Sequence, residues 1–345
     1  MGGRKLERQI AGMPAGPGIY AFRDRRGRLL YVGKAVNLRR RAGSYLEPDG
    51  GHTGHTRSLR TKAAQVEFLE TGSELEALIV EARAIRAHQP AFNVVGRHSR
   101  HYVFVKATQE RFPRIQAVRE IASDGASYYG PFPPELDVDE ALAGLQGILK
   151  WRRCEQFERE PCLHHQVGHC LAPCADFGVA PYRGMLRVLD GVLRGDGAGV
   201  LAALDQKMRS SAAALQFERA AALRDRRKAL ASLLHRSPFL TLDVVYVEPQ
   251  RFEARLLALR AGRLVLARTV SRATRDAFTG AATGFLSEAF SGEPPAPARS
   301  DLELREVDVV SAFLARKEDS GRTVRVSGRS ATETLAAVVT AVRKV

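Results

Sequence analysis

Two apolar stretches of strand length, separated by turn residues, open the first third of the chain. Residues 18–23 read Gly-Ile-Tyr-Ala-Phe-Arg, residues 24–27 read Asp-Arg-Arg-Gly, and residues 28–33 resume an apolar pattern. Such an arrangement predicts a β-hairpin. If residues 24–27 form a four-residue loop, Tyr20 lies directly opposite Tyr31 and both phenols stand on one face. An aromatic pair that only stabilises the hairpin explains the same pattern.

A strongly basic segment follows the hairpin. Residues 34–46 predict a helix on which Asn37, Arg41 and Tyr45 form one polar stripe. Eight basic residues and a single acidic one lie between Arg23 and Arg41. This density suits contacts to phosphates, and a solvated basic helix is the alternative.

A second helix is expected from Ser73 to the residues before Pro90. Ser73 with Glu76 three residues later is a capping-box pattern, and the proline ends the apolar stripe that follows. Glu81 lies at the edge of that stripe, where its carboxylate can point into the domain. A simply solvated glutamate is the alternative.

The composition narrows the class of protein. A chain of 345 residues that is 45% hydrophobic can form roughly two to four globular domains. Its 53 Lys and Arg residues exceed its 38 Asp and Glu residues, which gives a formal net charge of +15. Residues 1–100 hold 18 of the basic side chains and 9 of the acidic ones. The excess fits a polyanionic partner such as nucleic acid, or else a basic protein surface that is merely solvated.

Neither a signal sequence nor an apolar run of the ~18–20 residues that a spanning helix needs is found. We therefore expect a cytoplasmic protein without a membrane segment.

All four cysteines lie within one short segment, at Cys154, Cys162, Cys170 and Cys174. In a chain without a signal sequence this clustering indicates a metal or cluster site rather than disulfides. Four thiolates can hold a [4Fe–4S] cluster or zinc, and a neighbouring histidine could replace one of them. Four reduced structural cysteines are the remaining alternative.

The rest of the chain predicts helices and then a small α/β unit. From about residue 199 an Ala- and Arg-rich region has the period of an amphipathic helical hairpin. The C-terminal quarter predicts strands at 243–247, 254–259, 264–270 and 323–326, and helices at 274–290, 307–317 and 330–344.

Several of these residues together resemble the GIY-YIG nuclease domain of the UvrC family, which includes UvrC and its shorter homologue Cho. They are Gly18–Tyr20, Tyr31–Lys34, Arg41, Tyr45, Glu81 and Asn93, with Val32 where the motif name has isoleucine. The resemblance implies an α+β multidomain protein whose first domain has a central antiparallel sheet. It also implies a metal-dependent DNA endonuclease of nucleotide excision repair that nicks the damaged strand on the 3′ side of a lesion.

The resemblance assigns roles that suit phosphodiester hydrolysis. Glu81 would be the sole protein ligand of Mg²⁺ or Mn²⁺. Tyr20 would be the general base, its phenol acidified by Lys34, the metal or Tyr31, and Arg41 would stabilise transition-state charge. Orientation is expected from Tyr31, Tyr45 and Asn93, and DNA contacts from Arg39 and Arg40.

Two further segments are similar to this family. Residues 162–174 resemble its cysteine-rich region, which implies an iron–sulfur cluster, with zinc as the alternative. The helical hairpin resembles the UVR motif through which UvrC binds UvrB, with contacts expected from Phe217, Glu218, Arg224 and Asp225. Gln216 and Arg227 depart from that motif, since an acidic and an aliphatic residue are usual at these positions.

These expectations divide the chain into four parts. They are a nuclease domain at 1–100, a connecting and cysteine-rich region at 101–180, a helical region with the UVR-like motif at 181–237, and a small α/β domain without an RNase H-like nuclease centre at 238–345. The resemblance also implies a bacterial, nucleoid-associated protein that acts on damaged double-stranded DNA with UvrB as partner, and we expect a monomer. The alternatives are a non-enzymatic DNA-binding repair accessory and a GIY-YIG nuclease of another pathway.

Overall fold

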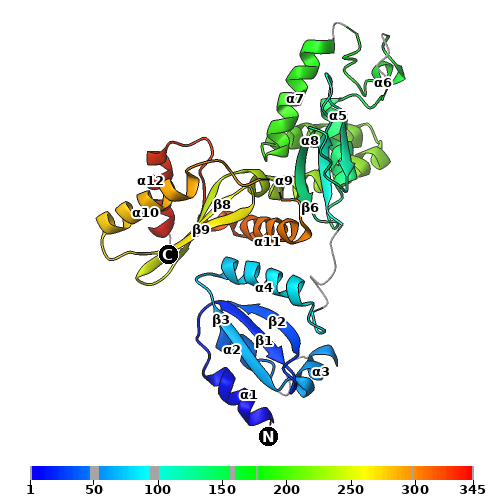
Figure 1. Ribbon diagram of the computed structural model, residues 1–345. Coiled ribbons are helices and arrows are strands. Elements are labelled where there is room, and N and C mark those ends of the chain that lie inside the picture. The colour runs from blue at the N-terminus through cyan, green and yellow to red at the C-terminus, as the bar shows by residue number, and fades with distance from the viewer. Residues whose placement is uncertain are drawn as a thin grey trace. The chain divides into compact units, whose positions relative to one another are not determined.

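The computed structural model describes residues 2–46, 54–93, 101–155, 160–175, 178–296 and 298–343, and side chains within these ranges apart from 2–4 and 54–56. The chain forms two compact units (Figure 1). The first joins residues 1–100 to residues 243–345, and the second comprises residues 101–242. The first unit is therefore built from two segments that are distant in sequence. In the described residues no helix is long and apolar enough to cross a membrane.

The N-terminal segment of the first unit is a layered α/β domain. Its antiparallel sheet has the order β2-β1-β3, with β1 at Gly18–Arg23, β2 at Leu29–Ala35 and β3 at Gln65–Glu70. The helices are α1 (Gly2–Ala11), α2 (Leu38–Gly43), α3 (Gly54–Lys62) and α4 (Glu74–His88). Buried side chains of α1, α2 and α3 form one core with Tyr20 and Phe22 of the sheet, and α4 covers the opposite face (Figure 1). The predicted central antiparallel sheet is confirmed.

The register of the predicted hairpin is different from the expected one. Tyr20 pairs with Gly33, and Tyr31 pairs with Phe22. The shift arises because Asp24 accepts two loop amide N–H groups, at 2.8 and 2.9 Å, and a bulge follows where strand pairing begins. Since the offset is two residues, both phenols remain on one face of the ribbon.

The basic helix is shorter than predicted, because β2 runs on to Ala35. Asn37 is the N-cap of α2, and its side chain accepts the backbone N–H of Arg40 at 2.9 Å. Short polar side chains favour this position because they satisfy a helix N–H group that has no partner within the helix. Asn37 is thus outside the helix, and the expected stripe with Arg41 and Tyr45 is wrong.

The second helix agrees with its prediction. Ser73 accepts the backbone N–H of Glu76 at 3.1 Å and its hydroxyl contacts the Glu76 carboxylate at 2.8 Å. The helix ends at His88, followed by Gln89 in the left-handed region, directly before Pro90.

The C-terminal segment of the first unit is the predicted α/β unit. Its antiparallel sheet has the order β10-β7-β8-β9, with β7 at Val244–Pro249, β8 at Glu253–Arg260, β9 at Arg263–Ser271 and β10 at Thr323–Arg325. Helices α10 (Arg275–Phe290) and α12 (Ala331–Arg343) share one core with this sheet. Helix α11 (Asp301–Lys317) packs against β7 of this sheet. The rings of Phe313 and Tyr246 meet there edge to face, with their centroids 5.1 Å apart. A short 3₁₀ helix, Glu318–Ser320, follows.

The second unit contains a small sheet and mostly helices. The sheet has the order β5-β4-β6, with β4 at Val103–Ala107, β5 at Ile115–Val118 and β6 at Ser127–Phe132. The helices are α5 (Val138–Leu149), α6 (Leu163–Gln166), α7 (Val179–Leu193), α8 (Ala198–Ala213) and α9 (Phe217–Thr241). Helices α8 and α9 form the predicted hairpin.

Candidate active site

Three phenols gather on one face of the N-terminal sheet. Tyr20 comes from β1, Tyr31 from β2 and Tyr45 from the turn after α2. Their ring centroids lie 5.9–6.1 Å apart, and the Tyr20 hydroxyl donates to the Tyr45 hydroxyl at 3.3 Å. Tyr20 is only 1% exposed. The structure therefore brings together the three tyrosines that the sequence selected.

The two glycines of the motif are required by close packing, Gly33 against the phenols and Gly18 against the neighbouring strand. A Cβ atom on Gly33 would lie 2.6 Å from the Tyr20 hydroxyl and 2.7 Å from a ring carbon of Tyr31. A Cβ on Gly18 would collide with the Leu69 carbonyl of the neighbouring strand. Neither position can hold a larger residue without displacing the sheet or the phenols.

Burial sets the protonation state of the phenols. Burial, together with the neighbouring Tyr31 and Tyr45, raises the pKa of Tyr20 far above its usual value, and Arg41 only partly opposes this. Burial also raises the pKa of Tyr31. The expectation that Tyr31 acidifies Tyr20 is therefore wrong. In these surroundings burial favours the neutral form of both phenols.

Glu81 of α4 reaches the end of β2. Its Oε1 atom accepts the backbone N–H of Lys34 at 3.0 Å. Burial raises the pKa of Glu81, while the hydrogen bond and charge of Lys34 oppose the shift. A nearby cation would stabilise the ionised form of this partly buried carboxylate. Carboxylate oxygens are also ligands that Mg²⁺ prefers.

The Lys34 side chain is held by a residue that the sequence analysis missed. Its Nζ lies 2.8 Å from Oε1 of Glu74 in the first turn of α4. Partial burial of Glu74 acts to raise its pKa, but the hydrogen bond and charge of Lys34 outweigh this and hold it below its usual value. An acidic residue in the first turn of a helix is usually explained by the helix dipole, so the sequence carried no separate signal for Glu74.

Asn93 fixes the backbone of β2 beside the phenols. It is 6% exposed; its Oδ1 accepts the Val32 N–H at 2.9 Å and its Nδ2 donates to the Val32 carbonyl at 2.8 Å. Because Val32 lies between Tyr31 and Gly33, this pair of hydrogen bonds positions the second half of the motif.

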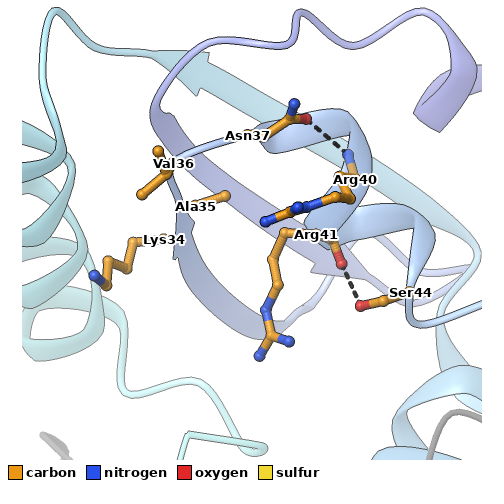
Figure 2. Close-up of a pocket in the computed structure, with 7 residues that line it drawn as sticks. All are labelled: Lys34, Ala35, Val36, Asn37, Arg40, Arg41 and Ser44. Atoms are coloured by element: carbon orange, nitrogen blue, oxygen red, sulfur yellow. Dashed lines mark hydrogen bonds between the residues drawn. The ribbon is translucent and has the colours of Figure 1, made fainter.

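A basic pocket of about 320 Å³ opens beside these groups. It is lined by Lys34, Ala35, Val36, Asn37, Arg40, Arg41 and Ser44 (Figure 2). The Arg41 guanidinium lies 5.5 Å from the centre of the Tyr45 ring, so the pocket adjoins the phenol cluster. Arg39, by contrast, donates from Nε to the Met13 carbonyl at 2.7 Å and does not line the pocket.

The four cysteines lie in the second unit. Cys162 is the N-cap of α6, Cys170 is buried, and Cys154 and Cys174 are partly exposed. Burial raises the pKa of the Cys170 thiol, and the other three cysteines raise it further. Among the residues described, no group of three or more Cys, His, Asp or Glu side chains has an arrangement that could hold a metal ion. The described side chains of this segment therefore do not show how a metal ion or cluster would be coordinated.

The turn of the α8–α9 hairpin exposes apolar side chains. Leu215 is 74% and Phe217 65% exposed, and Glu218 follows in the first turn of α9. Arg224 and Asp225 pair with each other at 3.0 Å on the surface. Arg227 departs from the motif pattern. Its Nε lies 2.6 Å from Oδ1 of Asp205 in α8, and this ion pair joins the two helices of the hairpin.

A three-stranded antiparallel sheet, a phenol cluster against Gly33 and a helix carboxylate at the end of β2 define a GIY-YIG domain. Family descriptions agree: "UvrC-like GIY-YIG domain" matches residues 16–94, "UvrC/Cho excinuclease, middle domain" residues 102–180, and "UvrB/uvrC motif" residues 198–232. These matches cover more than half of the sequence, and the chain belongs to the UvrC family.

Similar proteins carry the same family name. The UvrABC system protein C of Desulforudis audaxviator is 40% identical over 257 residues, which are 73% of this chain and 40% of that protein. That of Thermus thermophilus is 36% identical over 262 residues, or 74% and 42% of the two chains. The solved GIY-YIG N-terminal endonuclease domain of UvrC from Thermotoga maritima, described as bound to magnesium, is 34% identical; the match covers 26% of this chain and 97% of that one, with a TM-score of 0.24. The chain spans about 40% of the length of the curated relatives that it matches.

Proposed function

We propose that this chain is a divalent-metal-dependent DNA endonuclease of nucleotide excision repair, which nicks the damaged strand on the 3′ side of a lesion. One observation carries the proposal: a buried phenol cluster, a basic pocket and a partly buried carboxylate meet around the end of β2. Arg41 belongs to both the pocket and the phenol cluster, and Lys34 belongs to the pocket and binds Glu81 through its backbone.

Glu81 is the proposed ligand of Mg²⁺, or of Mn²⁺. A single carboxylate leaves the cation's remaining positions to water and phosphate oxygens, as Mg²⁺ prefers. When bound, the cation would supply activation of water and neutralisation of charge on the leaving oxygen. The raised pKa of Glu81 supports this assignment, because a cation would compensate a carboxylate that burial disfavours.

The remaining residues bind and orient the phosphate. Arg41 would place fixed positive charge against the transition state, and Arg40, which lines the same pocket, would hold a neighbouring phosphate. Tyr20 is the proposed general base. Burial raises its pKa in spite of the charge of Arg41, so the further positive charge of a bound cation would have to lower it for this role. Tyr31 and Tyr45 surround this hydroxyl, and Asn93 would fix the strand that carries Tyr31.

Glu81→Gln tests the proposal. The substitution removes the charge that holds the cation while keeping side-chain size, so nicking of a lesion-containing duplex in Mg²⁺ should be abolished and DNA affinity should be retained. Glu67→Gln is the matched control, because Glu67 pairs with Arg23 on the surface. Unchanged nicking by Glu81→Gln would remove Glu81 from the mechanism. If the wild-type chain fails to nick with and without UvrB, the function is that of a DNA-binding accessory.

We further propose that the α8–α9 hairpin binds UvrB. The exposed Phe217 supports an apolar contact, with Glu218, Arg224 and Asp225 as flanking charges. Phe217→Ala should weaken binding to purified UvrB and leave the nuclease centre unchanged. Equal affinity of the two forms would exclude Phe217 from the contact.

For the cysteine segment we propose a [4Fe–4S] cluster, with zinc as the alternative. The clustering of all four cysteines between residues 154 and 174 supports this proposal. Anaerobic purification followed by visible absorption spectroscopy and metal analysis separates iron from zinc, and absence of both metals would leave four reduced cysteines. The four-part domain division is likewise a proposal.

A further inference from the structure

Helix α4, which carries Glu81, is held by the C-terminal segment of the same compact unit as well as by its own sheet. Helix α11 packs against α4, as Figure 1 also shows. Among the described residues, four ion pairs join α4 to residues 243–345. They are Glu74–Lys317 at 3.6 Å, Glu76–Arg255 at 2.6 Å, Arg83–Glu306 at 2.6 Å and Arg86–Asp301 at 2.8 Å. Two pairs precede Glu81 and two follow it, so the contact spans the helix on both sides of the proposed metal ligand.

The Arg83–Glu306 pair combines two hydrogen bonds with a deeply buried carboxylate. Both Nε and Nη2 of Arg83 donate to Oε2 of Glu306, at 3.0 and 2.6 Å. The Glu306 side chain is only 8% exposed. A carboxylate this deeply buried depends on its partner, since loss of the partner leaves an uncompensated charge.

Glu74 connects helix α11 to the proposed nuclease centre. Its Oε1 binds the Lys34 ammonium at 2.8 Å, and its Oε2 lies 3.6 Å from the Lys317 ammonium. Glu81, two turns further along α4, accepts the Lys34 backbone N–H. Two carboxylates on one helix therefore bind one residue of the site, and a shift of α4 would weaken both of these bonds to Lys34.

We propose that α11 is a buttress of the nuclease centre, and that Glu306 and Lys317 are positioning residues. They act through Arg83 and Glu74, and so keep the side chains of Glu81 and Lys34 in position at the end of β2. The effect on catalysis rests on the proposed function, whereas the effect on α4 does not.

A charge exchange in the full-length chain tests the proposal. Arg83→Glu and Glu306→Arg each place like charges together, and the double variant restores an ion pair of opposite direction. Arg268→Glu is the matched control, because Arg268 pairs with Glu288 at 2.6 Å within the C-terminal segment and away from α4. Lys317→Gln is a milder variant that removes one charge without introducing repulsion.

Two measurements are made on each variant. Hydrogen exchange of the Lys34 amide, without metal or DNA, should be roughly tenfold faster in each single variant, because a charged hydrogen bond that holds α4 is lost. The Mg²⁺ concentration for half-maximal nicking should rise roughly tenfold or more, with KM for DNA unchanged. The double variant should restore both values, Lys317→Gln should shift them in the same direction by less, and the control should match the wild type.

Unchanged exchange and unchanged Mg²⁺ dependence in the single variants would overturn the proposal, as would a folded double variant that restores neither. If the wild type does not nick but Lys34 exchange responds as expected, the buttress is supported and the proposed function fails. If folding is lost in Arg83→Glu, Lys317→Gln decides by the same two measurements.

Discussion

At the scale of single residues, Asn93 shows how a side chain can support a site without lining its pocket. Its side-chain amide accepts a hydrogen bond from the Val32 N–H and donates one to the Val32 carbonyl. Asn93→Ala removes the partners of a buried N–H and a buried carbonyl. We expect the free energy of unfolding to fall by roughly 1–3 kcal/mol, measured by chemical denaturation. Asn93→Asp, which can accept but not donate when ionised, should also be destabilised. An unchanged denaturation midpoint for both variants would show that this clamp contributes nothing to stability.

The buried phenol of Tyr20 predicts a pH dependence of stability. Burial raises its pKa in the folded protein above the unfolded value of ~10. Below pH ~10 the phenol is neutral in both the folded and the unfolded state, and its contribution to the free energy of unfolding is fully present. As the pH rises past it, the unfolded chain loses the proton while the folded chain keeps it, so the free energy of unfolding falls. Wild type should therefore lose more stability than Tyr20→Phe between about pH 9 and 11, in denaturation curves recorded at each pH. Parallel losses in the two proteins would contradict a raised pKa.

At the scale of elements, the start of α11 depends on one cap. Ser300 accepts the Glu303 N–H at 3.2 Å and the Glu303 carboxylate accepts the Ser300 N–H at 3.1 Å, which closes a capping box. Ser300→Ala should lower the free energy of unfolding by about 1 kcal/mol, measured by denaturation. Ser300→Asp, which keeps an acceptor at the cap, should lose less; equal losses would mean that the cap is not the cause.

The same kind of side-chain hydrogen bond explains where the sequence misled. The prediction placed the start of α11 at residue 307, yet Ser300 starts it at Asp301. Asp24 lengthens the hairpin loop, and Asn37 delays α2 until Leu38. Apolar periodicity reports buried faces but not such caps, so the hairpin, α2 and α11 were predicted but their ends were not. The phenols were still placed on one face, because side-chain direction in a strand has a period of two residues.

At the scale of the whole molecule, the association of residues 1–100 with residues 243–345 could not be predicted from the sequence. The ion pairs that join them link residues far apart in the sequence: Glu76 and Arg255 are separated by 179 positions, and Arg83 and Glu306 by 223. In a basic, charge-rich sequence each of these side chains resembles a solvated surface residue. The tyrosines and Glu81 were recognisable because they belong to a motif, whereas Glu74 is recognisable only once Lys34 and Lys317 are seen on either side of it.

The net charge of +15 also belongs to the whole chain, and it predicts how DNA binding depends on salt. Each phosphate that a basic side chain neutralises releases counterions, so affinity falls as salt concentration rises. If Arg40 contacts a phosphate from the pocket, Arg40→Ala should weaken binding to every duplex alike and reduce the slope of log K against log salt by about one. Arg194→Ala is the control, since its guanidinium already pairs with Asp190 at 2.9 Å, and its slope should equal that of the wild type. Fluorescence anisotropy over a salt series measures both slopes. A slope for Arg40→Ala equal to that of the wild type would mean that the pocket does not engage the DNA backbone through this residue, and that the basic excess acts through other surfaces of the chain.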